Sequence, residues 1–265
     1  MPQPFAHQPR KRFGQHFLND QTILAEMVAA IAPQPDDTLV EIGPGLGALS
    51  EPLLARLYCL HAIEIDRDLA ELLRKRYPPE RLALHECDAL KFDFVQLSRQ
   101  LGAPLRIAGN LPYNISTPLL FRLVECAAVL VDAHLMLQKE VVERVVAAPG
   151  TASCSRLSVM MQYRFYCEWL LDVTPESFDP PPKVESAVLR LSPRPAEQCA
   201  TDFNALSLLV SAAFGQRRKM LRNTLRGLFD EAQLDALGIN PTSRAESLSI
   251  ADYLRLACEL QNRAK

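Results

Sequence analysis

A glycine-rich segment, Glu41-Ile42-Gly43-Pro44-Gly45-Leu46-Gly47, follows an apolar run typical of a buried strand and precedes an amphipathic stretch. Glycines at such a turn let the backbone bend sharply and approach a ligand closely. Glu64 ends the next strand-like run, where a carboxylate can accept hydrogen bonds from both hydroxyls of a ribose. Asp88 follows a third such run and can accept from the amino group of an adenine. These residues predict a site for an adenosine-containing cofactor. On their own they do not distinguish a dinucleotide from S-adenosylmethionine, and an isolated glycine triplet would be as typical of a structural turn.

The tetrapeptide Asn110-Leu111-Pro112-Tyr113 follows a fourth strand-like run, which places it at the same edge of the expected sheet. The exocyclic amine of adenine is flat and weakly nucleophilic, because its lone pair is delocalised into the ring. Two acceptors aimed at its N–H groups would favour a pyramidal nitrogen, and the Asn110 side-chain oxygen and the Leu111 carbonyl are candidates. Pro112 makes the turn rigid and favours an extended Leu111. Tyr113 offers a ring on which the base can stack.

These residue types suit a methyl transfer to an adenine amine. A sulfonium methyl is already a strong electrophile, so we expect in-line transfer governed by position and electrostatics, with no covalent nucleophile. A strong general base is not required either, because the amine loses its proton easily once it is alkylated. The alternative is an ordinary β-turn, since Asn, Pro and Tyr are common turn residues.

The elements that must position these residues alternate between strands and helices from residue 38 to about 137, which is typical of βαβ units and a parallel sheet. The candidate strands are Thr38–Ile42, Leu60–Ile65, Leu82–Glu86, Leu105–Gly109 and His134–Leu137. The candidate helices between them are Leu46–Arg56, Leu69–Arg76 and Pro118–Glu125. A preceding helix around Ile23–Ile31 is expected to be capped by Asn19 or Asp20.

The second half of the chain has a different order. A helix-like run from Arg156 precedes two strand-like runs, Phe165–Val173 and Val184–Leu191, which predict an antiparallel hairpin at the sheet edge. Pro193–Thr201 resembles a linker, and only helical patterns follow, the last opened by a Ser249-x-x-Asp252 capping signature. We therefore expect a catalytic α/β domain over residues 1–192 and a small helical domain over residues 193–265.

The charge of the chain is near balance, with 29 basic and 31 acidic side chains and a formal net charge of −2. That total argues against a general polyanion binder. Its distribution argues the other way, because residues 1–19 and 203–229 carry +8 with no acid, against 21 basic and 31 acidic groups elsewhere. This distribution is typical of a protein that binds a structured nucleic acid through two limited basic patches.

The two patches contain the candidate RNA-binding residues. The first holds Arg10, Lys11 and Arg12; the second holds Arg217, Arg218, Lys219, Arg222 and Arg226, whose spacing predicts one flank of a helix. A charge run is more often a solvated face. Five cations without an acid, beside residues suited to base modification, favour phosphate contact.

The remaining features exclude several classes of protein. Seven scattered cysteines without a CxxC pair disfavour a zinc site and a disulfide framework, and no metal is expected. No apolar stretch is long enough to predict a membrane span, and no signal peptide is expected. We expect a cytoplasmic protein that acts as a monomer.

The sequence resembles the bacterial 16S ribosomal RNA adenine dimethyltransferase family. EIGPGLG, EIDRDLA, NLPYNISTPLLF, MLQKEVVERVVAAPG, FDPPPKVESAVLRL and FGQRRKMLRNTL carry the resemblance, from Arg10 to about Leu256. It implies a Rossmann-like S-adenosylmethionine-dependent methyltransferase sheet, mostly parallel with an antiparallel edge hairpin, plus a small all-α C-terminal domain. It also implies that two adjacent adenines in the 3′-terminal hairpin loop of 16S rRNA are the targets, each converted to N6,N6-dimethyladenine within the 30S subunit during its biogenesis.

The resemblance also assigns roles to residues. His16 and Leu18 would line the donor site with Gly43, Gly45, Glu64, Asp88 and Asn110; many relatives have Asn where this chain has His16. Phe178 would sandwich the target base opposite Tyr113, although read alone it is a core residue. Ser153-Cys154-Ser155 replaces a Tyr-Gly that relatives often show.

Three alternatives stay open at this point. A 23S rRNA adenine dimethylase is one, although such relatives tend to have Ile in place of Leu111 and lack a clear FGQRRK segment. A non-catalytic small-subunit assembly factor is another, which intact Asn110, Tyr113 and Glu64 disfavour. A NAD-dependent enzyme is the third, and nothing else in the chain suggests hydride chemistry.

Overall fold

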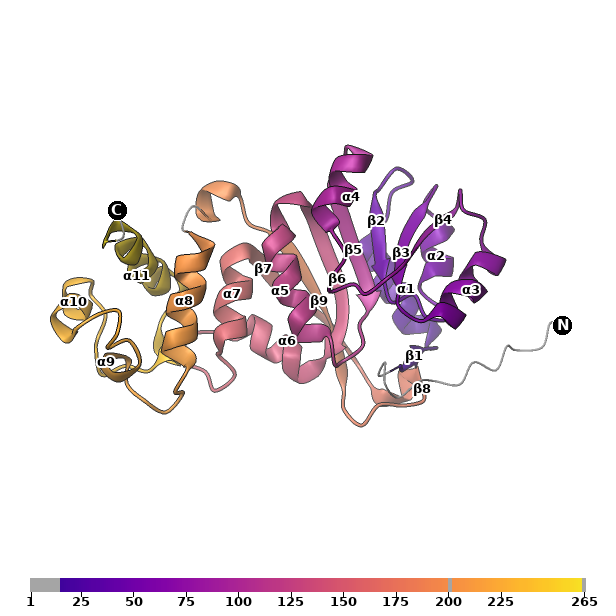
Figure 1. Cartoon of the computed structure of the whole chain (residues 1–265). Helices are drawn as coiled ribbons and strands as arrows, with labels where there is room; N and C mark the ends of the chain where they lie inside the picture. The colour runs from indigo at the N-terminus through magenta and orange to yellow at the C-terminus, as the bar shows by residue number, and fades with distance from the viewer. Residues whose placement is uncertain (1–14, 200–201, 264–265) are drawn as a thin grey trace. The chain divides into compact units, whose positions relative to one another are not determined.

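The computed structural model describes residues 15–199 and 202–263, and these form two compact units (Figure 1). The first unit contains the described residues up to Val142 together with Glu168–Ser192. The second contains Glu143–Cys167 and the chain from Pro193 onward. The sequence suggested a single boundary at residue 193, whereas the structure also places 143–167 with the C-terminal helices. The roles of the two units stay a proposal.

The described strands form a seven-stranded sheet and a two-stranded sheet, and all but the first three residues of β7 and the last residue of β9 belong to the first unit. The strands are β1 (Phe17–Leu18), β2 (Leu39–Ile42), β3 (Leu60–Glu64), β4 (Leu82–Glu86), β5 (Leu105–Asn110), β6 (Leu130–Gln138), β7 (Phe165–Val173), β8 (Phe178–Asp179) and β9 (Ser186–Pro193). The five parallel strands lie where the sequence predicted them, with ends that shift by a few residues.

The order of the large sheet is β4-β3-β2-β5-β6-β9-β7. β4, β3, β2, β5 and β6 pair in parallel, and β9 pairs antiparallel with β6. The order reverses beside β2, so the crevice beyond the carboxyl ends of β2 and β5 is where an open α/β sheet binds its ligand. The mostly parallel sheet with an antiparallel edge is confirmed.

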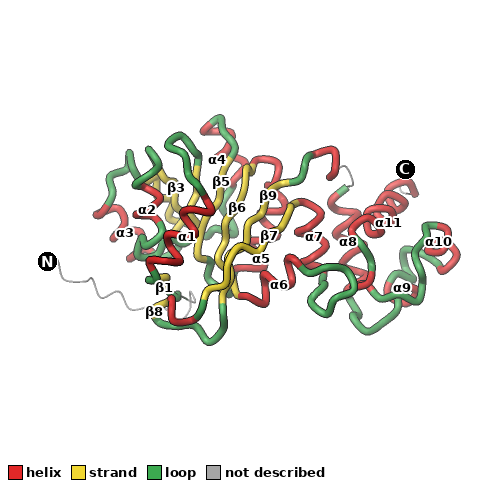
Figure 2. Tube along the Cα trace, turned by 180° about the vertical axis from the view of Figure 1, so that it is seen from behind, coloured by secondary structure: helices red, strands yellow, loops and turns green. Residues whose placement is uncertain are grey.

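The helices are α1 (Gln21–Ile31), α2 (Ser50–Leu54), α3 (Arg67–Arg76), α4 (Phe94–Leu101), α5 (Ser116–Cys126), α6 (Lys139–Val146), α7 (Arg156–Arg164), α8 (Phe203–Phe214), α9 (Leu221–Thr224), α10 (Glu231–Ala236) and α11 (Ile250–Arg263). Figure 1 shows α5 in front of the strands, and Figure 2, seen from behind, shows α1 in front of them. Helices thus cover both faces of the sheet.

Apolar stripes attach the helices of the first unit to the strands. One cluster of buried side chains contains residues of α2, α3 and the central strands together with Leu24, Met27, Val28 and Ile31 of α1.

The Asp20 carboxylate accepts from the backbone N–H groups of Thr22 and Ile23, so Asp20 is the predicted cap of α1. The α2 region is shorter than expected, because residues 45–49 form a turn around the glycines.

The second unit is helical. α8 packs against α7 and α11, which explains why residues before 168 belong to it. Ser249 and Asp252 form the predicted cap of α11, with the Ser249 N–H donating to the Asp252 carboxylate and the Asp252 N–H donating to the Ser249 hydroxyl.

Candidate active site

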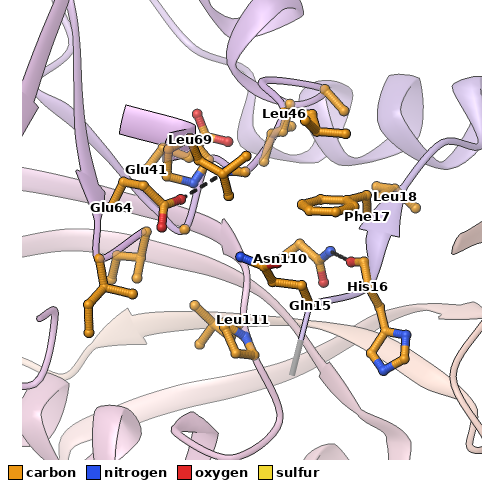
Figure 3. A pocket seen from close by; sticks show the side chains of 18 of the residues that line it. Gln15, His16, Phe17, Leu18, Glu41, Leu46, Glu64, Leu69, Asn110 and Leu111 are labelled. Atoms are coloured by element: carbon orange, nitrogen blue, oxygen red, sulfur yellow. Dashed lines mark hydrogen bonds between the residues drawn. The ribbon is translucent and has the colours of Figure 1, made fainter. Parts of the chain in front are cut away.

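A cavity of about 610 Å³ lies in the first unit at the carboxyl ends of β2, β3 and β5 (Figure 3). It is lined by the glycine loop, the end of β3, the loop after β4, the end of β5 and the segment from Gln15 to Asn19. Cavities of this size bind small molecules and cofactors. In Figure 3, Glu41, Glu64 and Leu69 lie on one side, Gln15, His16, Phe17 and Leu18 lie on the other, and Asn110 lies between them.

The glycine loop adopts backbone angles that other residues rarely take. Gly43 has φ +68 and Gly45 has φ +58, both in the left-handed region. A Cβ on Gly45 would also lie 3.1 Å from the Phe17 ring. The loop therefore needs glycine for its conformation and for the close approach of the N-terminal segment.

Glu64 is almost fully buried, and its carboxylate is held by the backbone around it. One oxygen accepts from the Gly45 N–H at 3.2 Å and the other accepts from the Asp66 N–H at 2.8 Å. Burial raises the pKa of Glu64, while these two hydrogen bonds oppose the rise. Each carboxylate oxygen keeps capacity for a further donor, so the group can still accept from a ligand's hydroxyls.

Glu41 is a second buried acid on the cavity wall, which the sequence reasoning treated only as part of the glycine motif. Its carboxylate accepts from the Ser50 hydroxyl at 2.6 Å. Burial raises the pKa of Glu41 to about 7, with the nearby Glu64 charge adding to the effect. The signal that could have found it is a charged residue inside an otherwise apolar strand.

Asp88 follows β4 and lines the cavity in a half-buried position. One carboxylate oxygen accepts from the Leu90 N–H at 2.9 Å, which fixes the side chain. No described residue donates to the other oxygen, which can accept from a ligand in the cavity. Asp88 and Glu64, with Glu41 and Asp179, outnumber Arg76, the basic side chain of the lining, so the cavity wall is acidic and suits a cationic ligand.

Asn110 ends β5 and is held in one orientation. Its Nδ2 donates to the backbone carbonyl of His16 at 3.0 Å. This hydrogen bond identifies which end of the amide is the nitrogen. Within the described part of the chain no group donates to Asn110 Oδ1, so this oxygen is a preset acceptor on the cavity wall.

Leu111 and Pro112 continue the cavity wall. Leu111 is buried and its N–H donates to the Met136 carbonyl at 3.1 Å, which ties it to β6. The Pro112 carbonyl accepts from the Ile115 N–H and the Ser116 hydroxyl, both at 3.2 Å, and closes the turn. The Leu111 carbonyl accepts no hydrogen bond from the residues that the structure describes, so it is a second free acceptor beside Asn110.

The Tyr113 ring lines the same end of the cavity. Its hydroxyl lies 2.8 Å from the hydroxyl of Ser186, which is fully buried at the start of β9. Burial raises the pKa of Tyr113. Its ring stacks on the His16 imidazole with centroids 5.6 Å apart. Neither Ser186 nor this stacking was foreseen, because both contacts join segments far apart in the sequence.

The short strand β1 supplies Leu18 to the cavity, and His16 directly precedes this strand. β1 pairs antiparallel with β8, with Leu18 opposite Phe178. The two-residue strands carry too little sequence pattern to be predicted.

Phe178 is the expected site residue that the structure does not bring to the cavity. Its side chain is 3% exposed and belongs to the apolar cluster around α1. This arrangement agrees with the interpretation of Phe178 as a core residue. In the structure the ring presents no open face to a base.

The basic residues of the second patch lie in the helical unit but not on one helix. Arg217, Arg218 and Lys219 occupy the turn between α8 and α9, so the predicted single helical flank is wrong. The chain leaves helical conformation after Phe214 and reaches an extended Met220. Arg10, Lys11 and Arg12 lie outside the described residues.

The cations of this patch differ in their surroundings. Arg217 donates to the backbone carbonyls of Ala152 and Cys154, and Arg222 lies 3.6 Å from the Glu231 carboxylate. The side chains of Arg218, Lys219 and Arg226 are exposed and have no partner among residues 15–199 and 202–263. These three are therefore available to an anion.

Two further lining residues were missed by the sequence reasoning. Gln15 donates to the Asp66 carboxylate at 3.1 Å and so connects the N-terminal segment to the start of α3. Arg76 lines the cavity and donates to the Leu46 carbonyl at 3.3 Å.

The described residues contain no group of three His, Cys, Asp or Glu side chains that could hold a metal. None of the described helices combines the length and the apolar composition that a membrane span requires.

Comparison with known proteins gives one consistent family. The model described as "Ribosomal RNA adenine dimethylase" matches residues 6–262. "Ribosomal RNA small subunit methyltransferase A" of Dechloromonas aromatica is 58% identical over 252 residues, which are 95% of this chain and 97% of the relative. The protein of the same name from Thiobacillus denitrificans is 59% identical over 258 residues, 97% of this chain and 100% of the relative.

Solved structures agree with this result. A dimethyladenosine transferase from Plasmodium falciparum has a TM-score of 0.81 at 27% identity, covering 94% of this chain and 98% of its own. The 23S rRNA methyltransferase ErmE has a TM-score of 0.69 at 24% identity, covering 92% of this chain and 99% of its own, and shares the fold.

Proposed function

This chain belongs to the ribosomal RNA adenine dimethylase family, and we propose that it dimethylates N6 of two adjacent adenines in the 3′-terminal hairpin loop of 16S rRNA. S-adenosylmethionine is the methyl donor and the small ribosomal subunit is the substrate. Relatives that are more than half identical over nearly the whole chain carry a small-subunit methyltransferase name. The observation that carries the proposal is a pair of acceptors on the wall of the cavity, Asn110 Oδ1 and the Leu111 carbonyl, to which no described residue donates.

The residues of the donor half fit S-adenosylmethionine. The positive-φ glycines Gly43 and Gly45 leave room for a ligand against the loop. Glu64 offers acceptors for the ribose hydroxyls and Asp88 offers one for the adenine amine. Leu18 and Phe17 supply apolar wall. The donor carries a positive sulfonium and an ammonium group, so the acidic wall favours it over an anionic dinucleotide.

When bound, the donor supplies an electrophilic methyl group, and the protein's task is to present the acceptor nitrogen to it. Asn110 Oδ1 and the Leu111 carbonyl accept from the two N–H groups of the adenine amine. These contacts favour a pyramidal nitrogen whose lone pair faces the donor half. The acceptors are fixed before the base arrives, Asn110 through His16 and Leu111 through Met136, so little reorganisation is needed at the moment of transfer.

Tyr113 provides the surface on which the flipped base stacks. Its hydroxyl is anchored by the buried Ser186, so its ring is held in place at the cavity edge. Base flipping costs a few kcal/mol, and stacking on an aromatic ring offsets part of that cost. Pro112 keeps the turn between the acceptors and the ring rigid.

We assign contact with the RNA backbone to exposed basic side chains. Arg218, Lys219 and Arg226 are the described members of the patch without a protein partner, and Arg222 is only weakly paired. Arg217 mainly stabilises the backbone of residues 152–154 through its hydrogen bonds to two carbonyl groups. Arg10, Lys11 and Arg12 are proposed as a second contact. We further propose that the protein works as a monomer in the bacterial cytoplasm, where small subunits are assembled.

One experiment separates this function from its alternatives. The protein is incubated with labelled S-adenosylmethionine and, in parallel, with unmethylated small subunits or naked 23S RNA. We expect dimethyladenosine in small-subunit RNA alone. Label in 23S RNA alone would favour the 23S dimethylase, and subunit binding without any label would favour a non-catalytic assembly factor.

A further inference from the structure

The loop between β8 and β9 borders the acceptor half of the cavity and is fixed there at both ends. At its start, the Pro180 carbonyl oxygen lies 2.7 Å from Nδ1 of His16. At its end, the Glu185 carbonyl accepts a backbone N–H from the start of α6, and the next residue is Ser186, whose hydroxyl contacts that of Tyr113. In Figure 1 the loop lies beside β1 and β8, at the lower end of the strands. The loop is therefore a fixed part of the rim of the cavity.

Lys183 is presented to solvent by this loop. It directly follows three prolines, Pro180, Pro181 and Pro182, whose fixed φ angles leave the backbone little freedom. Pro182 is buried, so the chain is packed immediately before the lysine. The Lys183 side chain is exposed, and its ammonium has no hydrogen-bond or ion-pair partner within residues 15–199 and 202–263. A rigid backbone thus holds a cation whose charge is available to a ligand.

The neighbouring charges on this rim are either acidic or already paired. Asp179 is exposed and lines the cavity. Lys139 lies 2.8 Å from the Glu185 carboxylate and 3.4 Å from that of Asp172. A phosphate that approaches the rim is repelled by Asp179, and Lys183 is the lysine that can attract it without first breaking an ion pair. Lys183 therefore decides where on this rim a phosphate can bind.

A flipped nucleotide brings two phosphates to the rim. Its base enters the cavity, whereas the phosphates on its 5′ and 3′ sides stay outside, because they are charged and continue the RNA chain. We propose, as an extension of the proposed function, that Lys183 is a phosphate-binding residue of the acceptor site and that its ammonium binds one of the two phosphates flanking the target adenosine. This contact differs from those of Arg218, Lys219 and Arg226, because it forms only when a nucleotide enters the cavity.

The proposed reaction takes place on two adjacent adenosines, so a different phosphate lies at the rim when the second adenosine enters. A lysine ammonium is a point charge with three donors on a flexible stem, and it can follow this change. Loss of the charge at residue 183 should therefore slow both dimethylations.

The first test compares Lys183→Gln and Lys183→Arg with the unchanged protein on unmethylated small subunits. Loss of one charged contact should raise KM about 3- to 10-fold and lower the slope of log KM against log salt by about 0.7. Lys183→Arg keeps the charge and should stay within about 2-fold of the unchanged KM.

Arg56→Gln is the matched control. Arg56 is exposed, its side chain has no partner among the described residues, and it precedes β3 at the opposite edge of the sheet. This variant removes the same charge and should leave KM and the salt slope unchanged. Equal effects of Arg56→Gln and Lys183→Gln would show a response to overall charge and would overturn the proposal.

The second test identifies the phosphate. Small subunits are reconstituted with 16S RNA that carries one neutral methylphosphonate in place of a single phosphate beside a target adenosine. At the bound phosphate, this replacement should raise KM in the unchanged protein and add nothing in Lys183→Gln, because both changes remove the same contact. Additive effects at every flanking phosphate, or an unchanged KM in Lys183→Gln, would refute the contact.

The Kd of the subunits, measured alongside KM, separates this proposal from the proposed function. Absence of methyl transfer by the unchanged protein would refute the proposed function, while non-additive losses of subunit affinity would still support the phosphate contact. Normal transfer with additive losses would refute the contact and leave the proposed function intact. Because Lys183 is exposed and unpaired among the described residues, both of its variants should unfold at the Tm of the unchanged protein.

Discussion

The Asn110 side-chain amide donates to the His16 backbone carbonyl at 3.0 Å and joins two segments 94 residues apart in the sequence. The N-terminal segment thereby orients the amide so that Oδ1, and not the NH2 group, is the free end. An acceptor in this place can bind an adenine amine, which has only donors to offer. The contact links the segment just before β1 directly to the proposed chemistry.

Removing the Asn110 acceptor should reduce transfer while substrate binding remains. We expect Asn110→Ala to lower the single-turnover rate at saturating donor by roughly 100-fold or more, by analogy with the loss of one preorganised hydrogen bond at a reacting centre. Small-subunit binding should be unchanged. Asn204→Ala, at an exposed position in α8, is the matched control and should retain the full rate. Equal loss of binding and rate in Asn110→Ala would contradict the assigned role.

The role of the glycine loop in donor binding can be tested with two alanine substitutions that should destabilise the backbone to a similar extent. Gly45 (φ +58) and Gly150 (φ +85) are both left-handed, so each Gly→Ala change should destabilise the fold by about 1–2 kcal/mol. Gly150 has no atom within 4 Å of its Cβ position, whereas Gly45 faces Phe17. Donor affinity, measured by calorimetry, should therefore weaken in Gly45→Ala alone. Equal affinities in the two variants would argue that the loop does not form the donor site.

Glu41 should make stability depend on pH. Its pKa is raised from 4.5 to about 7 in the folded protein, so the folded state binds the proton more tightly than the unfolded state. The stability that Glu41 contributes is therefore present below pH 4.5 and is lost as the pH rises to about 7. Over that window the wild type should lose roughly 3 kcal/mol relative to Glu41→Gln.

Urea denaturation of the protein without donor, at a series of pH values, measures this difference. Glu26→Gln, at an exposed position in α1, is the control and should follow the wild type at every pH. A constant difference between wild type and Glu41→Gln from pH 5 to 8 would contradict a folded-state pKa of about 7 for Glu41.

Arg218, Lys219 and Arg226, which have no partner among the described residues, should control the salt dependence of subunit binding. Replacing Arg218, Lys219 and Arg226 by alanine should weaken binding and reduce the slope of log K against log salt by about 2–3, near 0.7–0.9 per phosphate contact. Arg67, Lys75 and Arg255 each form an ion pair, so their triple replacement removes the same charge as a control. An unchanged slope in the first variant would remove these residues from the RNA interface.

Much of the α/β fold is readable in the sequence, because apolar runs such as those of β3 and β4 are ended by charged or turn residues. α4 and α6 were not foreseen, although Asp93 caps α4 through the Gln96 N–H. Short helices give few turns over which a period can be recognised. β1 and β8 depend on pairing across the chain, which a local pattern does not contain.

The candidate site also contains some residues that the sequence could place and others that it could not. Gly43, Glu64, Asp88 and Asn110 could be placed together because each follows a parallel strand, and the carboxyl ends of parallel strands share one edge. The stacking of His16 on Tyr113 and the burial of Phe178 depend on where β1 and β8 lie, so they needed the structure. The Arg217–Lys219 run was misread as a helix flank, because charge spacing alone does not reveal where α8 ends.

The proposed reaction is best tested by nucleoside mass spectrometry of small-subunit RNA after incubation with S-adenosylmethionine and the protein. We expect N6,N6-dimethyladenosine at two adjacent positions of the 3′-terminal hairpin loop with the wild type, and far less at the same enzyme concentration and time with Asn110→Ala, which should still bind donor and subunit. Absence of dimethyladenosine with the wild type, or its undiminished formation by Asn110→Ala, would rule out the proposed reaction.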